Sequence, residues 1–265
     1  MARKPFVLAV ETSSRIGSVA VALGEKMLAE TTFSAPIRHS AEIFPAIRGL
    51  LDRFSREPKE IEQIYISIGP GSFTGLRIAV TFAKTMHLAN TAKIVAVDTL
   101  DVIAANVINL TANGTVQDSI HEPRPYQRWD ERTTTGDDRI ATILDAKRGQ
   151  FFIAVYKRNT SDEQRATSGR IWQKILPDSL MTASEFLEKF RDSNQPIWLL
   201  GDGLLYYKGK FKAQGVHFCH EKYWSPRAGK VHSLGWHKAL AGQFADPVAL
   251  QPLYLRAPDV KLKRQ

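Results

Sequence analysis

The chain has 265 residues, of which 43% are hydrophobic and 24% are charged, and these are the proportions of an ordinary globular protein. Its single cysteine, Cys219, excludes an intramolecular disulfide and a cysteine-based metal cluster. The excess of 36 basic over 27 acidic side chains gives a net charge of +9, which permits a polyanionic partner such as RNA but is equally typical of a soluble basic protein.

The first part of the chain alternates between strand and helix patterns. Residues 6–33 predict three strands, with a polar corner "ETSS" after the first. A helix follows, with Ser40 as its expected N-cap, and Pro45 means that it either begins near Phe44 or is kinked. This part is completed by strand 64–68, a loop "GPGSFTG", a helix to about residue 89, strand 93–98 and a helix "TLDVIAANVI". The apolar stripe of the first helix comprises Ile43, Phe44, Ile47, Leu50, Leu51 and Phe54.

Residues 109–138 are polar, contain few aliphatic side chains and predict a mobile linker or insertion. Two strands around the turn "DAKRGQ" then open the second part, and "TASE" predicts a capped helix start. The last long helix is expected to begin with Ser225 as its N-cap. The pattern therefore predicts an α/β protein with two βββαβα-type lobes, residues 1–108 and 139–265, each a mixed sheet flanked by helices.

The glycine-rich loop after strand 64–68 matches neither standard nucleotide fingerprint. Gly75 is followed by Leu76 where a phosphate-binding loop needs lysine, and the glycine spacing is one residue too long for a dinucleotide-binding turn. Ser72 or Thr74 can cap the next helix, while Phe73 either plugs the core or protrudes. Arg77, in the first turn of that helix, indicates an acidic neighbour, either within the chain or on a partner.

The sequence contains no H-E-x-x-H zinc motif among its seven histidines and no G-x-S-x-G nucleophile elbow. We therefore expect no metal site, no catalytic residue and no protease activity in this chain. The short apolar run at the start of the sequence fits neither a secretory signal nor a membrane span, which predicts a cytoplasmic protein.

Several segments occur together in a characteristic order. They are "LAVETSS", "RHSAEIFPAIRGLL", "ISIGPGSFTGLRIAV", "AVDTLDVIA", "ILDAKRGQFFIAVY", "LLGDG" and "PLYLRAPD". In this order they resemble the bacterial TsaB family of tRNA threonylcarbamoyladenosine biosynthesis proteins, also called YeaZ. The resemblance covers nearly the whole chain except 109–138 and the last few residues, and the "GPGSFTGLRI" block is highly specific to the family.

The resemblance implies an actin-like ATPase (ribonuclease H-like) fold. It implies a non-catalytic scaffold subunit of a complex that transfers threonylcarbamoyl from threonylcarbamoyl-adenylate to N6 of the adenosine 3′ of the anticodon in tRNA. The implied partners are a TsaD-type paralogue, which performs the transfer, and a TsaE-type ATPase. ATP and metal are expected at those subunits, and no cofactor is expected in this chain. The paralogue's metal site is expected to be missing here, because Ile43 stands where the paralogue has a histidine four residues after the counterpart of His39. Direct tRNA contact and a homodimer of the isolated chain stay open.

The resemblance also implies a partner interface on the two helices near residues 40–54 and after "GPGSFTG". The expected contact residues are Ile43, Ile47, Leu50, Phe73, Leu76, Arg77, Val80, Ala83 and Lys84. For the apolar members of this set, packing in the chain's own core is the alternative.

Two other functions stay open. The two-lobe pattern is compatible with an autonomous small-molecule kinase or ATPase, in which Glu11 and the "GDG" turn, Gly201, Asp202 and Gly203, border a nucleotide between the lobes. Glu11 stands where many family members carry Asp, which argues against independent ATPase activity. An RNA-binding module is the third function, based on the net charge and the basic C-terminal residues.

Overall fold

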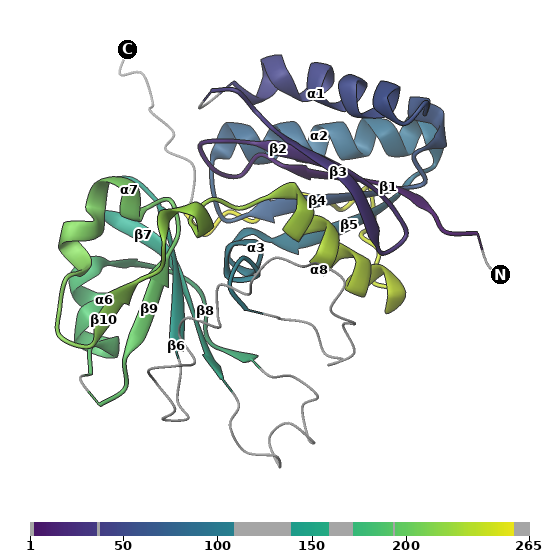
Figure 1. Cartoon of the computed structure of the whole chain (residues 1–265). Coiled ribbons are helices and arrows are strands. Elements are labelled where there is room, and N and C mark those ends of the chain that lie inside the picture. Colours follow the sequence, from purple (N-terminus) through teal and green to yellow (C-terminus); the bar gives the residue numbers. More distant parts are fainter. Residues whose placement is uncertain (1–2, 36–37, 109–138, 159–171, 193, 257–265) are drawn as a thin grey trace.

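Figure 1 shows the computed structural model of the chain as two lobes, each built on one sheet. The structure describes residues 3–35, 38–108, 139–158, 172–192 and 194–256, so the predicted linker or insertion at 109–138 lies outside the described residues.

The first sheet has five strands in the order β3-β2-β1-β4-β5. Strands β1 to β3 form an antiparallel meander, and β4 and β5 join it in parallel. This mixed arrangement is the one that the sequence predicts, because short turns connect the meander and helices connect the parallel strands. The strands are β1 (Phe6–Glu11), β2 (Ser18–Leu23), β3 (Lys26–Thr32), β4 (Gln63–Gly69) and β5 (Lys93–Asp98).

Both faces of the first sheet are covered. Helices α1 (His39–Arg53) and α2 (Phe73–Asn90) pack on one face, where Leu8 and Val10 join their core. The alternate residues Val7 and Ala9 pack on the opposite face with α8 (Ala228–Leu240). Burial on both faces explains why these strands are apolar at nearly every position.

Helix α8 packs against β1, β2, β4 and β5, although the predicted division places it in the lobe of residues 139–265. Its expected N-cap, Ser225, is wrong: the helix begins at Ala228. The Ser225 carbonyl accepts a hydrogen bond from Asn106 Nδ2 at 2.9 Å, and the Ala228 N–H donates instead to Ser18 Oγ of β2 at 2.8 Å. A hydroxyl distant in sequence therefore replaces the local cap.

The second sheet also has five strands, in the order β10-β9-β6-β7-β8. Helices α6 (Ala183–Phe190) and α7 (Leu204–Tyr207) belong to this lobe, and the predicted capping box Thr182–Glu185 is present. Helix α3 (Thr99–Ala104) contacts both sheets. The strands are β6 (Arg139–Asp145), β7 (Gln150–Arg158), β8 (Trp172–Thr182), β9 (Ile197–Leu200) and β10 (Val216–Phe218), and the 3-10 helices are η1 (Pro58–Glu60), η2 (Lys208–Phe211) and η3 (Glu221–Tyr223).

The predicted two-lobe α/β fold is confirmed, with one further correction in α1. The helix begins at His39, so Ser40 is inside it and Pro45 is an internal residue rather than part of its start. His39 is buried, and its Nε2 donates to the Ser14 carbonyl at 2.9 Å. This tertiary contact holds the first residue of the helix in place where the local sequence offers no side-chain cap.

Candidate functional site

The loop between β4 and α2 is held by the polar corner that follows β1. Ser72 is the N-cap of α2, and its Oγ accepts from the Gly75 N–H at 3.3 Å, as expected. The Ser72 N–H donates to the Ser13 carbonyl at 2.7 Å, and Thr12 Oγ1 donates to the Gly75 carbonyl at 2.8 Å. Corner and loop therefore fix the direction in which α2 leaves the sheet.

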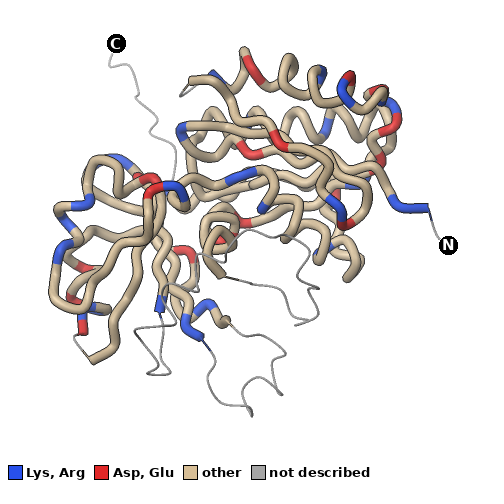
Figure 2. The backbone as a smooth tube through the Cα atoms, viewed as in Figure 1, with Lys and Arg blue, Asp and Glu red and all other residues tan. Residues whose placement is uncertain are grey.

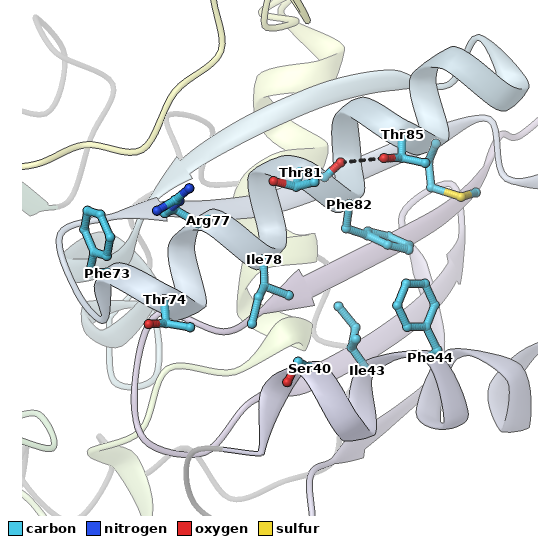
Figure 3. Close-up of a pocket in the computed structure, with 11 residues that line it drawn as sticks. Ser40, Ile43, Phe44, Phe73, Thr74, Arg77, Ile78, Thr81, Phe82 and Thr85 are labelled. Carbon is cyan, nitrogen blue, oxygen red and sulfur yellow. Dashed lines mark hydrogen bonds between the residues drawn. The ribbon is translucent and has the colours of Figure 1, made fainter.

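An apolar groove of about 450 Å³ lies between α1 and α2 (Figure 3). Phe44 of α1 and Phe82 of α2 meet edge to face, with ring centroids 5.9 Å apart. Ile43 and Ile78 point toward each other from the two helices, while Phe73 and Arg77 lie at one end (Figure 3). Phe44 is 65% exposed and Phe73 is 45% exposed, which is unusual for phenylalanine on one continuous surface.

The predicted interface residues fall into two groups. Phe73 and Arg77 are exposed at the groove, and Lys84 is partly exposed, with its Nζ bonded to the Val248 carbonyl at 3.2 Å. The other six are buried, and all of them except Leu76 belong to the core between α1, α2 and the first sheet, which favours the core alternative for their side chains. They are Ile43, Ile47, Leu50, Leu76, Val80 and Ala83.

Phe44 is the groove residue whose burial was wrongly predicted from the sequence. The periodic pattern assigns it to the core stripe of α1, whereas its ring stands at the edge of that stripe and is exposed. The only signal was the width of the stripe, since Ile43 and Phe44 are adjacent and cannot both point at the centre of one helix face.

The Phe73 side chain protrudes from the loop and does not plug the core beneath it. Its ring stacks on Tyr254 with centroids 5.1 Å apart, and the Arg77 guanidinium lies 5.3 Å from the ring centroid. Among the described residues Arg77 has no carboxylate partner, so the expected local acidic neighbour is absent from this part of the chain. An aromatic ring and an unneutralised cation therefore stand together at the end of the groove.

The C-terminal segment 250–256 connects the two lobes. The Leu253 N–H donates to the Ile68 carbonyl of β4 at 2.7 Å. Three residues later, Arg256 Nη1 donates to the Ala146 carbonyl of the second lobe at 2.6 Å. Tyr254, between these two contacts, stacks on Phe73, so this segment reaches both the groove and the space between the lobes.

A second cavity of about 630 Å³ lies between the lobes. Serine hydroxyls from the corner and from the α2 cap line it, together with Tyr206, two carboxylates, Asp145 and Asp202, and four cationic side chains. The cations are Arg15, Lys147, Arg148 and Arg256.

Of the four weak nucleotide candidates, Asp202 alone lines this cavity. Glu11 is fully buried; its carboxylate accepts the Ser13 N–H at 2.6 Å and also the hydroxyls of Ser13 and Ser67. Gly201 and Gly203 serve packing, because an added Cβ would lie 2.1 Å and 3.0 Å from the Ile143 carbonyl oxygen. Glu11 thus holds the corner in shape. Burial raises the pKa of its carboxyl, and the charge of Asp202 raises this pKa further.

No group of three or more His, Cys, Asp or Glu side chains suited to a metal ion occurs among the described residues. Within the same ranges no helix is long and apolar enough to cross a membrane.

Asp202 provides a test of the cavity's electrostatics. Burial raises the pKa of its carboxyl to about 6, although the Arg15 N–H, 3.4 Å from Oδ2, opposes this shift. The native state therefore keeps a proton between about pH 4 and about pH 6 that the unfolded chain releases, so this group makes the protein less stable as the pH rises through that window. The free energy of unfolding of Asp202→Asn, measured by urea unfolding, should rise relative to that of wild type by about 1–3 kcal/mol as the pH is raised from about 4 to about 7. A difference that does not grow with pH would show that the carboxyl ionises normally.

The chain is similar in sequence and in fold to proteins named for tRNA threonylcarbamoyladenosine biosynthesis and to YeaZ. The family model for TsaD, tRNA N6-adenosine threonylcarbamoyltransferase, matches residues 32–116. The chain is 26% identical over 267 residues to a Bacillus subtilis tRNA threonylcarbamoyladenosine biosynthesis protein TsaB, covering 97% of this chain and 96% of that one. It is 28% identical to the TsaB of Buchnera aphidicola from Acyrthosiphon pisum, covering 74% of each. The solved structure of YeaZ from Pseudomonas aeruginosa has the same fold, with a TM-score of 0.69, 21% identity, and coverage of 95% of this chain and all of that one.

Proposed function

We propose that the chain is a non-catalytic partner subunit of the TsaB/YeaZ type in tRNA threonylcarbamoyladenosine biosynthesis, a process supported by its similarity to TsaB proteins and to the TsaD family model. In this proposal a TsaD-type paralogue carries out the transfer of threonylcarbamoyl to tRNA and a TsaE-type ATPase completes the complex. The chain itself supplies a rigid docking surface.

The groove between α1 and α2 is the observation that carries the proposal. Its walls are apolar, and Phe44 and Phe73 are exposed there at a cost in hydration that a bound partner would remove. Aromatic anchors with an arginine beside them are the composition of interface hot spots. We therefore expect the partner to place apolar side chains against Phe44 and a carboxylate against Arg77.

The polar corner supports a scaffold role. Glu11 accepts hydrogen bonds from Ser13 and Ser67, is fully buried and does not line the cavity. Its hydrogen bonds join the corner to β4, and Ser13 and Thr12 of the corner hold the loop from which α2 starts, so the corner contributes to the shape of the docking surface. A homodimer of the isolated chain would use this same groove.

An autonomous kinase or ATPase is the second candidate, favoured by the cavity between the lobes. Asp202 lines it with Asp145 and four cationic side chains, of which Lys147 is paired with Asp145, and phosphate groups could use the arginines. Calorimetry with ATP and Mg²⁺ on the isolated chain tests this candidate. Binding and turnover that Asp202→Ala abolishes would establish it, and the absence of tight binding would reject it.

The proposed role predicts a specific cellular defect. Deleting the gene should remove threonylcarbamoyladenosine from tRNA, measured by mass spectrometry of digested tRNA, and wild-type chain should restore it. The purified chain alone should transfer no threonylcarbamoyl to tRNA, whereas addition of the TsaD-type and TsaE-type subunits should restore transfer. Normal modification in the deletion strain would contradict the proposal.

A further inference from the structure

A basic and aromatic surface surrounds α7 and is separate from the groove. The segment "LLYYKGKFK", residues 204–212, contains three lysines and no acidic residue. In Figure 2 Lys and Arg follow one another along this outer edge of the second lobe. We define the α7 surface as Arg15, Lys147, Tyr206, Tyr207, Lys208, Lys210 and Lys212.

Contacts link Arg15, Tyr206, Tyr207 and Lys210 within the α7 surface, and the Tyr206 and Tyr207 ring centroids are 6.5 Å apart. The Arg15 guanidinium lies 4.9 Å from the Tyr206 ring centroid and also donates to the Tyr206 hydroxyl. Lys210 Nζ lies 5.3 Å from the ring centroid of the adjacent Tyr207. Tyr206 and Lys147 both line the cavity between the lobes, so the surface begins at the rim of that cavity.

Three lysines of this surface keep their charge available, whereas Lys147 is paired with Asp145 at 2.7 Å. Among the described residues no carboxylate lies within ion-pairing distance of Lys208, Lys210 or Lys212. Lys208 instead lies over the rings of Phe218 and Trp224, at 5.1 Å and 5.5 Å from their centroids. Aromatic neighbours orient a lysine without neutralising it, so the field of this surface is positive.

Tyr206 adds a second feature that points to a nucleic acid. Its side chain is 67% exposed although tyrosine has a large apolar ring, and Arg15 holds one side of that ring. An exposed, oriented ring beside Lys208, Lys210 and Lys212, which have no carboxylate partner among the described residues, is the combination on which unpaired nucleotides stack while their phosphates contact lysine. An acidic protein would use the cations but gives no reason for the exposed ring.

We propose that the α7 surface binds RNA, with a base of an unpaired segment stacked on Tyr206 and the phosphate backbone along Lys208, Lys210 and Lys212. The proposal rests on the proposed function in that tRNA is the RNA that a subunit of this complex would meet. It makes this chain a contributor to substrate binding as well as a docking surface.

The test measures binding of unmodified tRNA and of its anticodon stem-loop to the isolated full-length chain over a range of salt concentrations. Replacing Lys208, Lys210 and Lys212 together with Gln should weaken binding and lower the slope of log affinity against log salt by about 0.7 for each lost phosphate contact. The matched control replaces the exposed Lys4, Lys26 and Arg53 of the first lobe with Gln and should leave the slope unchanged, although it removes the same total charge.

Tyr206 distinguishes stacking from charge attraction. Tyr206→Ala should weaken stem-loop binding by about fivefold to a hundredfold, while Tyr206→Phe keeps the ring and should bind as wild type. Neither change should affect binding of heparin, a polyanion without bases. Equal slopes for both triple variants, or no effect of Tyr206→Ala, would overturn the proposal.

The RNA-binding test can fail or succeed independently of the docking proposal, because no partner subunit is present in the RNA measurement. If the lysine triple variant binds RNA normally and instead loses the TsaD-type or TsaE-type subunit in a pull-down, the surface serves an acidic protein and the RNA proposal is wrong. If RNA binding behaves as expected while the groove variants keep their partner, the RNA proposal stands and the docking proposal fails.

Discussion

Phe44→Glu should abolish tight binding of the TsaD-type partner. The ring of Phe44 forms part of the groove wall and is 65% exposed in the free chain, so a partner that covers the groove would bury it. A carboxylate at this position would be buried without a counter-charge, and changes at such anchors cost about 2 kcal/mol or more, or about 30-fold in affinity. Calorimetric titration of the purified partner measures this loss.

Leu88→Glu is the matched control for this experiment. Leu88 lies on the same helix, α2, and is 83% exposed, but it is not among the residues that line the groove. The control should bind the partner as wild type does. The free energy of unfolding of Phe44→Glu should lie within about 1.5 kcal/mol of the wild-type value, because the substitution removes mainly the edge-to-face contact with Phe82. Equal affinity of both variants and wild type would place the interface elsewhere.

Gly75→Ala should destabilise the fold more than any surface change. A Cβ at this position would lie 1.8 Å from the Thr12 carbonyl oxygen, and the atoms on both sides are backbone that cannot rotate away. Either α2 or the end of β1 must move, and we expect the free energy of unfolding to fall by about 3 kcal/mol or more. For a chain of this size that corresponds to a fall of about 6–12 °C in the thermal midpoint, measured by calorimetry.

Gly49→Ala is the control for the glycine experiment. Gly49 is inside α1, and an added Cβ would meet nothing within 4 Å. Alanine should therefore stabilise the protein by up to about 1 kcal/mol through its higher helix propensity. If Gly75→Ala is as stable as wild type, the close approach of the corner to α2 is not required for folding.

The predictions from sequence succeeded where neighbouring residues carry the signal. Strands of the first sheet are bounded by short polar turns, Ser72 caps α2 as its position before the helix suggests, and Thr182 and Glu185 form the expected capping box. These interactions join residues within one or two turns of each other, so the local sequence contains both partners. The order of strands and helices follows from the same local patterns.

The predictions failed where the partner is distant in the chain. The first N–H of α8 donates to Ser18, and the next, that of Gly229, donates to Glu30 at 3.0 Å. Nothing near Ser225 reveals that β2 and β3 supply these acceptors, so the local cap was a reasonable but wrong choice. Similarly, Arg77 is expected beside an acidic group by the helix dipole, yet it lies over Phe73.

By itself the sequence determined the two-lobe α/β architecture, the "GPGSFTG" turn as the start of a helix and the motifs that resemble those of the TsaB/YeaZ family. Periodicity and motifs are local properties, and the chain folds consistently with them. Only the tertiary structure decided that Phe44 and Phe73 are exposed while Leu76, Val80 and Ala83 are buried, because a helix pattern gives the apolar face but not its edges. It also decided that Tyr254 stacks on Phe73 and that Arg15 orients Tyr206, since both contacts join segments more than 150 residues apart.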